Sequence, residues 1–295
     1  MSTTLRKSVT PWLFTLLALA CIVFILIVPV LSGVRLSFFE YAMRDFAAGR
    51  DPVFIGLDNF RILFSSANFQ ASIRVTLVFV SSVVVFELLL GLILALLMEG
   101  GIKGLRLFRT LFILPIMIAP VVVGLIWRFM YHPSFGILNY FLLRLGLDPI
   151  PWLHSSEWAL RSVIIADVWQ WTPFVFLILL AGLQGVSKDL IEAGIVDGCS
   201  YLQNLFFVKL PSIASIIAVA AILRLIDAFR SLVVIYVMTY GGPGVSTEVM
   251  SLHLYKTAFM AQRLGRAAAI AVILLAILIA LSSVLVVRTL RTERK

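Results

Sequence analysis

The sequence has 295 residues, of which 61% are hydrophobic and 13% are charged. Soluble domains are typically ~45–50% apolar and ~25% charged, so this composition excludes a soluble enzyme, a disordered chain and a nucleic-acid-binding domain. The formal net charge of +9 therefore indicates membrane topology and contact with lipid headgroups. Two cysteines, Cys21 and Cys199, are too few for a disulfide framework or a metal cluster.

Six apolar stretches are each long enough to cross about 30 Å of hydrocarbon. They must be helical, because lipid offers the backbone no hydrogen-bond partners. The predicted spans are residues 12–34, 74–98, 107–130, 159–183, 212–238 and 265–287. The first is longer than a signal-peptide core of about 7–15 residues and lacks a clear A-x-A-like cleavage site, so we retain it as a span. We expect residues 1–295 to form a single all-α integral membrane domain.

Basic residues outside the spans predict the orientation. With residue 1 placed inside, the internal segments are 1–11, 99–109, 184–211 and 288–295, and they hold eleven Lys and Arg residues. Five of the six lysines lie there, and the external segments carry basic residues at lower density. Because cytoplasmic loops are enriched in Lys and Arg, we expect both ends of the chain to be cytoplasmic.

The external segments contain several turn-forming residues. Gly241-Gly242-Pro243-Gly244 predicts the end of the fifth helix. The three histidines, His132, His154 and His253, lie outside the internal segments and show no metal-ligand spacing. We expect them to be exposed loop residues.

The internal segment 184–211 is patterned. Ser187 is placed to cap a helix that begins near Lys188, and Asp189 in the first turn suits the helix dipole. Apolar and charged residues alternate until Gly198 interrupts the pattern, and a second apolar stripe follows. We predict two short helices that are joined at this glycine and lie along the inner face of the membrane, with a partner covering their apolar residues.

The spacing within this segment is specific. Glu192-Ala193-Gly194 is followed by three residues, Gly198, nine residues, Val208, one residue and Leu210-Pro211. This pattern resembles the EAA loop of ABC-importer permeases, E-A-A-x3-G-x9-I-x-L-P, at every spacing. Gly194 stands in place of the second Ala and Val208 in place of Ile. The glycine is expected to loosen the first short helix by ~1 kcal/mol relative to alanine.

Three further motifs are similar to the carbohydrate-uptake branch of these permeases, the binding-protein-dependent maltose and multiple-sugar type. They are I-G-L-D-N-F at 55–60, S-F-G-I-L-N at 134–139 and T-Y-G-G-P-G at 239–244, and the similarity continues from Ser246 to Phe259.

The resemblance implies an importer with several partners in a bacterial plasma (inner) membrane. Two permease subunits form the pathway, two cytoplasmic ATPase subunits dock on their EAA loops, and an extracytoplasmic binding protein delivers the sugar. We expect the second permease to be a related but different chain. Carried over by position, the residues that couple to the ATPase are Glu192, Ala193, Gly194, Asp197 and Gly198. The alternative is an ordinary interfacial amphipathic helix with a solvated acidic face.

Several ionisable residues lie inside the predicted spans. An ionised side chain at the bilayer centre costs at least ~2.5–3.5 kcal/mol, so these residues are expected to face the bundle interior or a cavity. Polar and aromatic residues share one face of the fourth span and one face of the fifth, and an aromatic ring beside a hydrogen-bonding group suits a sugar. The predicted substrate pathway consists of Asp167, Trp171, Phe174, Arg224, Asp227, Ala228 and Ser231.

These residues also have structural interpretations. Arg224 and Asp227 are spaced to pair with each other one turn apart, and the aromatic residues are also typical of helix packing. We interpret Glu87 and Arg128 as structural, and Arg128 can also reach the interface. The intramembrane arginines suit an anionic carbohydrate, but arginine in this part of the fifth span also resembles permeases of neutral sugars. Both substrate classes therefore stay open.

The sequence contains no G-x-x-x-x-G-K-[ST] motif, so we expect no cofactor on this chain and place ATP and Mg²⁺ on partner ATPase subunits. We expect no catalytic or metal site and no nucleic-acid partner. We predict a permease that moves a sugar or sugar derivative by alternating access. The alternatives are a polyol or glycerol-phosphate importer within the family, an ion- or proton-coupled secondary transporter with Glu87, Asp167 and Asp227 as a relay, and a non-transporting membrane scaffold.

Overall fold

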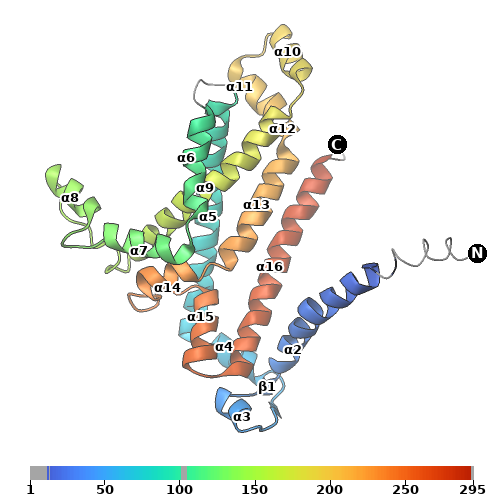
Figure 1. Ribbon diagram of the computed structural model, residues 1–295, viewed down its shortest axis with the longest axis vertical. Coiled ribbons are helices and arrows are strands. Elements are labelled where there is room, and N and C mark those ends of the chain that lie inside the picture. Colours follow the sequence, from blue (N-terminus) through green and yellow to red (C-terminus); the bar gives the residue numbers. More distant parts are fainter. Residues whose placement is uncertain (1–11, 13, 101–104, 294–295) are drawn as a thin grey trace, which may run out of the picture. The chain divides into compact units, whose positions relative to one another are not determined.

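The structure, a computed structural model, describes residues 12, 14–100 and 105–293. The chain divides into two compact units, residues 1–66 with 254–275 and residues 67–253 with 276–295. Among the described residues it is helical apart from one two-stranded sheet and the connecting loops (Figure 1). The predicted all-α membrane fold is confirmed, while the single domain stays a prediction.

The first unit contains the most N-terminal candidate span, Phe14–Leu36. Its elements are η1 (Val23–Ile27), α2 (Val28–Leu36), β1 (Phe39–Glu40), α3 (Met43–Ala47), β2 (Val53–Phe54), α4 (Asp58–Ser65), η3 (Lys256–Met260) and the beginning of α16 (Leu264–Glu293). The two strands pair antiparallel, with Phe39 opposite Phe54.

The side chain of Asn59 fixes the connection that follows the first span, through hydrogen bonds to its backbone. Asn59, from the I-G-L-D-N-F motif, is buried, and its Nδ2 donates to Ser37 O and to Phe39 O, both at 2.9 Å. The beginning of α16 also packs against this connection. Only a glycine fits at position 265, because a Cβ atom there would lie 2.0 Å from Phe39 O. The motif therefore has a structural role in fixing this connection.

Three helices form the core of the second unit: α5 (Ala67–Met98), α9 (Ala159–Gln184) and α13 (Ala214–Phe229). The other elements of this unit are α6 (Leu105–Met117), α7 (Pro120–Met130), α8 (Ile137–Arg144), α10 (Lys188–Val196), α11 (Tyr201–Asn204), η2 (Leu205–Lys209), α12 (Leu210–Ser212), α14 (Val233–Thr239) and α15 (Met250–Tyr255). Figure 1 shows α5, α9 and α13 packed together, with α10 and α11 at one end of this bundle.

Small residues allow these helices to approach closely. A Cβ on Gly91 of α5 would lie 2.8 Å from Val175 Cγ1 of α9, and a Cβ on Gly182 of α9 would lie 2.9 Å from Ile216 Cδ1 of α13. Close approach matters in a bilayer, because lipid tails are as apolar as the side chains and packing must hold the helices together.

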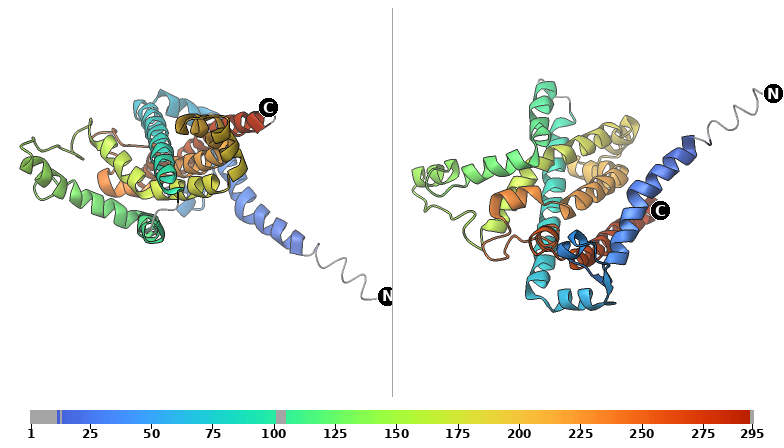
Figure 2. Two further views of the ribbon diagram at one scale, coloured as in Figure 1. Left: turned by 90° about the horizontal axis from the view of Figure 1, so that it is seen from above. Right: turned by 60° about the horizontal axis from the view of Figure 1, so that its bottom comes forward.

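Four predicted spans correspond to long helices, although α5 begins earlier than predicted, at Ala67. The third and fifth are not the continuous helices that we predicted. In the third, α6 and α7 meet at 100°, because Pro120 disfavours a helical conformation at Ala119 and donates no backbone N–H (Figure 2).

The fifth predicted span, 212–238, is interrupted as well. Tyr201–Ser212 and α13 meet at 65°, and residues 230–232 separate α13 from α14. The described residues therefore hold four unbroken candidate spans, or up to six if each bent pair forms one span. Residues 230–232, which are not helical, line the smaller cavity described below.

Candidate functional site

The core of the second unit contains a buried ion cluster on three helices. Arg224 of α13 donates through Nε to Glu87 Oε2 (2.5 Å) and through Nη2 to Glu87 Oε1 (2.8 Å) and Asp167 Oδ1 (2.9 Å). The three side chains are at most 4% exposed. The guanidinium also lies 4.7 Å from the centre of the Trp171 ring. Arginine suits this position, because its planar fork can bond a carboxylate at two points.

This cluster differs from the pairing considered from the sequence. Among the described residues, Arg224 bonds to carboxylates on α5 and α9 and not to Asp227, one turn away on its own helix. Glu87, which we interpreted as structural, is its principal partner. A charge buried this deeply is tolerated when it is paired and hydrogen-bonded.

A cavity of about 310 Å³ lies beside the cluster. Five of the seven predicted pathway residues line it: Asp167, Trp171, Arg224, Asp227 and Ser231. The other two, Phe174 and Ala228, do not line this cavity. Phe174 packs against the hydrophobic core of α5 and α9, with its ring at 88° to that of Trp171, and Ala228 is buried. Both lie on the predicted helix faces, but those faces also form helix contacts.

Several lining residues were not predicted from the sequence, above all Gln170. Its side chain is 1% exposed, and Nε2 donates to Ile118 O (3.2 Å), beside the α6–α7 bend. Gln170 lies three positions after Asp167, so the same helical spacing that selected Trp171 would have found it. Arg230 and residues 232–234 also line the cavity. Helical periodicity could not predict residues 232–234, because the helix is interrupted between α13 and α14 and the spacing of α13 does not continue into them.

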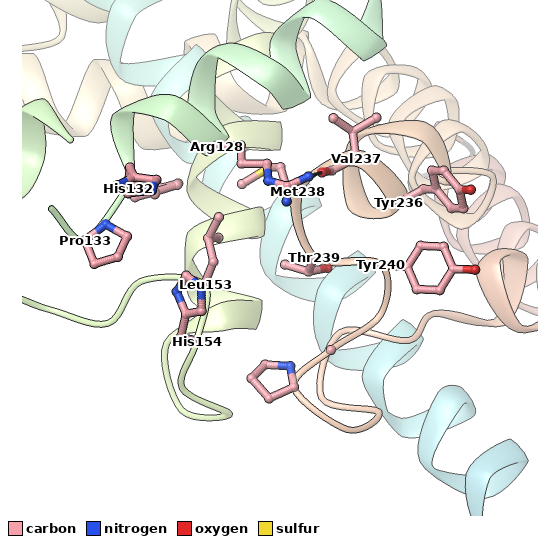
Figure 3. A pocket seen from close by; sticks show the side chains of 13 residues that line it. Arg128, His132, Pro133, Leu153, His154, Tyr236, Val237, Met238, Thr239 and Tyr240 are labelled. Carbon is pink, nitrogen blue, oxygen red and sulfur yellow. Dashed lines mark hydrogen bonds between the residues drawn. The ribbon is translucent and has the colours of Figure 1, made fainter. Parts of the chain in front are cut away.

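A larger cavity of about 780 Å³ lies between the end of α7, the 153–154 loop and α14 (Figure 3). His132 and His154 line it together with Arg128, whose Nη1 donates to Val237 O (3.2 Å). Arg128 therefore ties α7 to α14, and the two histidines border a cavity. The third histidine, His253, is not an exposed loop residue as we predicted, because it lies on α15 with Nδ1 2.6 Å from Glu248 Oε1.

Two of the motifs in this unit fix turns. Asn139 of the S-F-G-I-L-N motif is buried, and its Oδ1 accepts from Ile150 N (3.1 Å) and Trp152 Nε1 (2.8 Å). In the T-Y-G-G-P-G motif, α14 ends at Thr239 and Tyr240 has a positive φ of 56°. These residues therefore support the structure around the larger cavity.

The patterned segment 184–211 forms the two predicted helices. The first helix, α10, begins at Lys188, but the side chain of Ser187 makes no capping hydrogen bond, so that part of the prediction is wrong. Gly198 has a φ of +80°, and Cys199 N donates to Gly194 O (2.9 Å), which ends the helix with a left-handed residue. A capping box of Ser200 and Gln203 begins α11.

Gly194 has a packing role that the sequence did not suggest. A Cβ atom there would lie 2.9 Å from Asn204 Nδ2, which donates to Ile191 O (3.0 Å). Gly194 and Asn204 are both buried, so the glycine allows α11 to dock against α10. The loosening expected from glycine is thus accompanied by a contact that alanine would displace.

The five predicted coupling residues are divided by exposure. Glu192, Ala193, Asp197 and Gly198 are exposed, whereas Gly194 is buried. The same segment is tied to the end of α5, because Lys209 of η2 pairs with Glu99 and lies 5.6 Å from the centre of the Tyr201 ring. The exposed face of α10 is therefore held in place by the contacts of its buried side with α11 and of η2 with the end of α5.

Comparison with known proteins gives the family context. Residues 87–292 match the family described as "Binding-protein-dependent transport system inner membrane component". The chain is 38% identical over 290 residues to a probable ABC transporter permease protein, y4oQ, of Sinorhizobium fredii, covering 97% of this chain and 92% of the relative. It is 36% identical over 247 residues to the trehalose/maltose transport system permease protein MalF of Thermococcus litoralis, covering 84% and 82%.

The fold also matches a solved structure. A chain from the bacterial alginate ABC transporter, crystallised in complex with an alginate pentasaccharide-bound periplasmic protein, superposes with a TM-score of 0.74. The match covers 98% of this chain and 95% of the other at 23% identity. At this level of identity the similarity establishes the fold.

Proposed function

The chain belongs to the family of binding-protein-dependent transport system inner membrane components, and we propose that it is the permease subunit through which an ABC importer moves a sugar or a related polyhydroxylated solute. The observation that carries the proposal is the exposed face of α10, which lies at one end of the bundle and includes Glu192. The opposite side of α10 is fixed to α11 by Asn204. The carbohydrate substrate is supported by the Thermococcus relative, which is a trehalose/maltose transport system permease.

The cavity beside Arg224 is the proposed substrate site. Its lining combines carboxylate, guanidinium, amide and hydroxyl groups with the indole of Trp171. Polar groups that converge around an aromatic ring suit a sugar, whose hydroxyls form hydrogen bonds and whose ring faces are apolar. One permease supplies one wall of a pathway, so we propose that a second, related permease supplies the opposite wall.

ATP hydrolysis is assigned to partner subunits. We propose that two cytoplasmic ATPase subunits bind ATP and Mg²⁺ and that one of them receives the α10 face formed by Glu192, Ala193, Asp197 and Gly198. Gly194 lies on the buried side of the same helix and contacts Asn204. We also propose that both ends of the chain lie in the cytoplasm and that the larger cavity lies on the side where a binding protein delivers solute.

The structure suggests how movement at α10 would reach the substrate cavity. Asn204 holds α10 on α11, and Lys209 pairs with Glu99 at the end of α5. Twelve residues earlier, about 18 Å along the helix, α5 carries Glu87, the partner of Arg224. A displacement of α10 by the ATPase would therefore move α5 relative to α13, which is what alternating access requires.

The test is co-purification of a candidate ATPase subunit with the full chain, comparing wild type with Glu192→Lys. The matched control is Glu157→Lys, which reverses an exposed glutamate outside the coupling segment. We expect wild type and control to retain the ATPase and Glu192→Lys to lose it while still inserting into membranes. Equal retention by all three would refute the role of Glu192. Uptake that follows an ion gradient without any ATPase would instead favour an ion-coupled carrier.

A further inference from the structure

A third cavity, of about 160 Å³, lies in the first unit, where the first span ends at Leu36 and the last candidate span begins at Leu264. One water molecule needs only about 10–15 Å³, so this cavity has room for a group of several atoms. Four charged residues, from β1, α4 and the residues around the start of α16, line it: Glu40, Asp58, Arg263 and Arg266.

Two of these four side chains are paired with each other, and two are not. Arg263 Nη1 lies 3.7 Å from Glu40 Oε1 in an exposed pair. Among the residues that the structure describes, neither Arg266 nor Asp58 forms an ion pair or a side-chain hydrogen bond, and Nε of Arg266 is buried. One guanidinium and one carboxylate therefore line the same cavity without reaching each other, and a ligand between them could compensate both charges.

The backbone that carries these two side chains is fixed. Gly265 N, next to Arg266, donates to Tyr41 O (3.0 Å). Asn59, next to Asp58, is buried and bonds to two backbone carbonyl groups of the connection after the first span. The two charges are thus held in place before a ligand binds, which lowers the entropy lost on binding.

The surface of the same unit is apolar around this cavity. Exposed apolar groups mark a site of contact with a membrane or another protein, and aromatic residues near the ends of spans are typical of the interface between membrane and water. Because the cavity also lies at the ends of two spans, we expect it at the level of the lipid headgroups. The large apolar side chains of residues 37–66 that are more than half exposed are Phe46, Val53, Phe54, Leu57 and Phe64.

We infer that this cavity binds the headgroup of a zwitterionic phospholipid with a phosphate and a primary ammonium group, as in phosphatidylethanolamine. Arg266 donates to the phosphate, because a planar guanidinium can bond two of its oxygens at once. Asp58 accepts from the ammonium group, which has three N–H donors. The acyl chains contact the exposed apolar side chains of residues 37–66. A lipid without the ammonium group would leave the carboxylate of Asp58 beside its phosphate without a compensating charge.

The test is native mass spectrometry of the full chain, delipidated in detergent and titrated with three phospholipids that have identical acyl chains. Phosphatidylethanolamine has both groups, phosphatidylcholine has a quaternary ammonium without N–H donors, and phosphatidylglycerol has no cation. Free phosphoethanolamine is the probe for a soluble ligand. The variants are Arg266→Gln and Asp58→Asn. The matched controls are Arg61→Gln and Asp51→Asn, at exposed positions of the same unit outside the cavity lining.

We expect wild type to bind one molecule of phosphatidylethanolamine about tenfold more tightly than either of the other lipids, since a hydrogen bond to a charged group is lost with each of them. Asp58→Asn should bind all three lipids with similar affinity, because the variant no longer distinguishes the ammonium group. Arg266→Gln should weaken the binding of all three by about tenfold, because each has the phosphate. Both controls should behave as wild type.

Several results would overturn the inference. Equal binding of the three lipids, unchanged in both variants, would show only nonspecific lipid contact. A preference for phosphatidylglycerol would refute the role of Asp58. Binding of free phosphoethanolamine as tightly as the lipid would assign the cavity to a soluble ligand. If Arg266→Gln does not fold, Asp58→Asn decides alone, since loss of the preference supports the inference and an unchanged preference refutes it.

Discussion

Arg224 and Glu87, 137 positions apart in the sequence, form a two-point ion pair that joins α13 to α5 inside the helix bundle. The guanidinium has a third contact with Asp167 of α9, so one side chain connects all three core helices. Each member of this cluster was visible in the sequence as a charge inside an apolar stretch. Their pairing was not.

The first prediction concerns this pair. Glu87→Gln removes one of the two carboxylates that neutralise Arg224, and breaking a buried pair typically costs about 3–5 kcal/mol. We expect the free energy of unfolding, measured by SDS titration of the purified chain in mixed micelles, to fall by an amount in this range. The control is Glu157→Gln, which breaks an exposed pair with Arg161 and should cost about 1 kcal/mol or less. Similar losses in the two variants would show that the buried pair has no special weight.

The second prediction concerns close helix packing. Gly91→Ala places a methyl group 2.8 Å from Val175 Cγ1 and 3.0 Å from Phe176 N, so α5 and α9 must move apart. Overpacking of this kind costs about 1–3 kcal/mol. Gly33→Ala adds the same methyl group inside α2, where nothing lies within 4 Å, and should be neutral or stabilise by up to ~1 kcal/mol. The same SDS titration compares them, and a destabilising effect limited to Gly33→Ala would contradict the packing described.

The third prediction concerns the connection after the first span. Asn59→Ala leaves the carbonyl groups of Ser37 and Phe39 without the amide that now donates to both. Unsatisfied buried groups cost about 1–3 kcal/mol, so we expect faster limited proteolysis at the 37–58 connection. Asn68→Ala, at an exposed position near the start of α5, is the control and should be cleaved like wild type. Unchanged cleavage of Asn59→Ala would rule out this role.

The fourth prediction concerns transmission from α10 to α5. Lys209→Glu replaces the ion pair with Glu99 by two like charges. We expect the ATPase to remain bound but substrate uptake per ATP hydrolysed to fall severalfold, because η2 no longer holds the end of α5. The exchange variant Lys209→Glu with Glu99→Lys restores the opposite charges and should recover much of the uptake. If the exchange variant is no better than the single one, the ion pair does not carry the coupling.

Part of this protein could be predicted from sequence because the information is local. Hydrophobic length defines a span wherever it occurs, since lipid imposes the same demand on every backbone group. The two short helices of 184–211 could be predicted in the same way, because the apolar pattern and the break at Gly198 act over one or two turns, although the predicted cap at Ser187 is not formed. Even so, two spans that we predicted as continuous helices are interrupted, at Pro120 and at residues 230–232. Hydropathy did not predict these breaks, because it measures composition and not the direction of the backbone.

Which polar groups meet depends on how the helices pack against one another. Helical periodicity placed Asp167 and Arg224 on particular faces, but it could not orient those faces toward each other or toward Glu87 on a third helix. It favoured Phe174, which packs into the core, and passed over Gln170, which lines the cavity. Six apolar stretches and an EAA-like loop could be predicted from the sequence, because span length and loop spacing are properties of consecutive residues. The substrate cavity and the contacts behind Gly194 are set by atoms far apart in the chain, whose distances arise only when the helices pack.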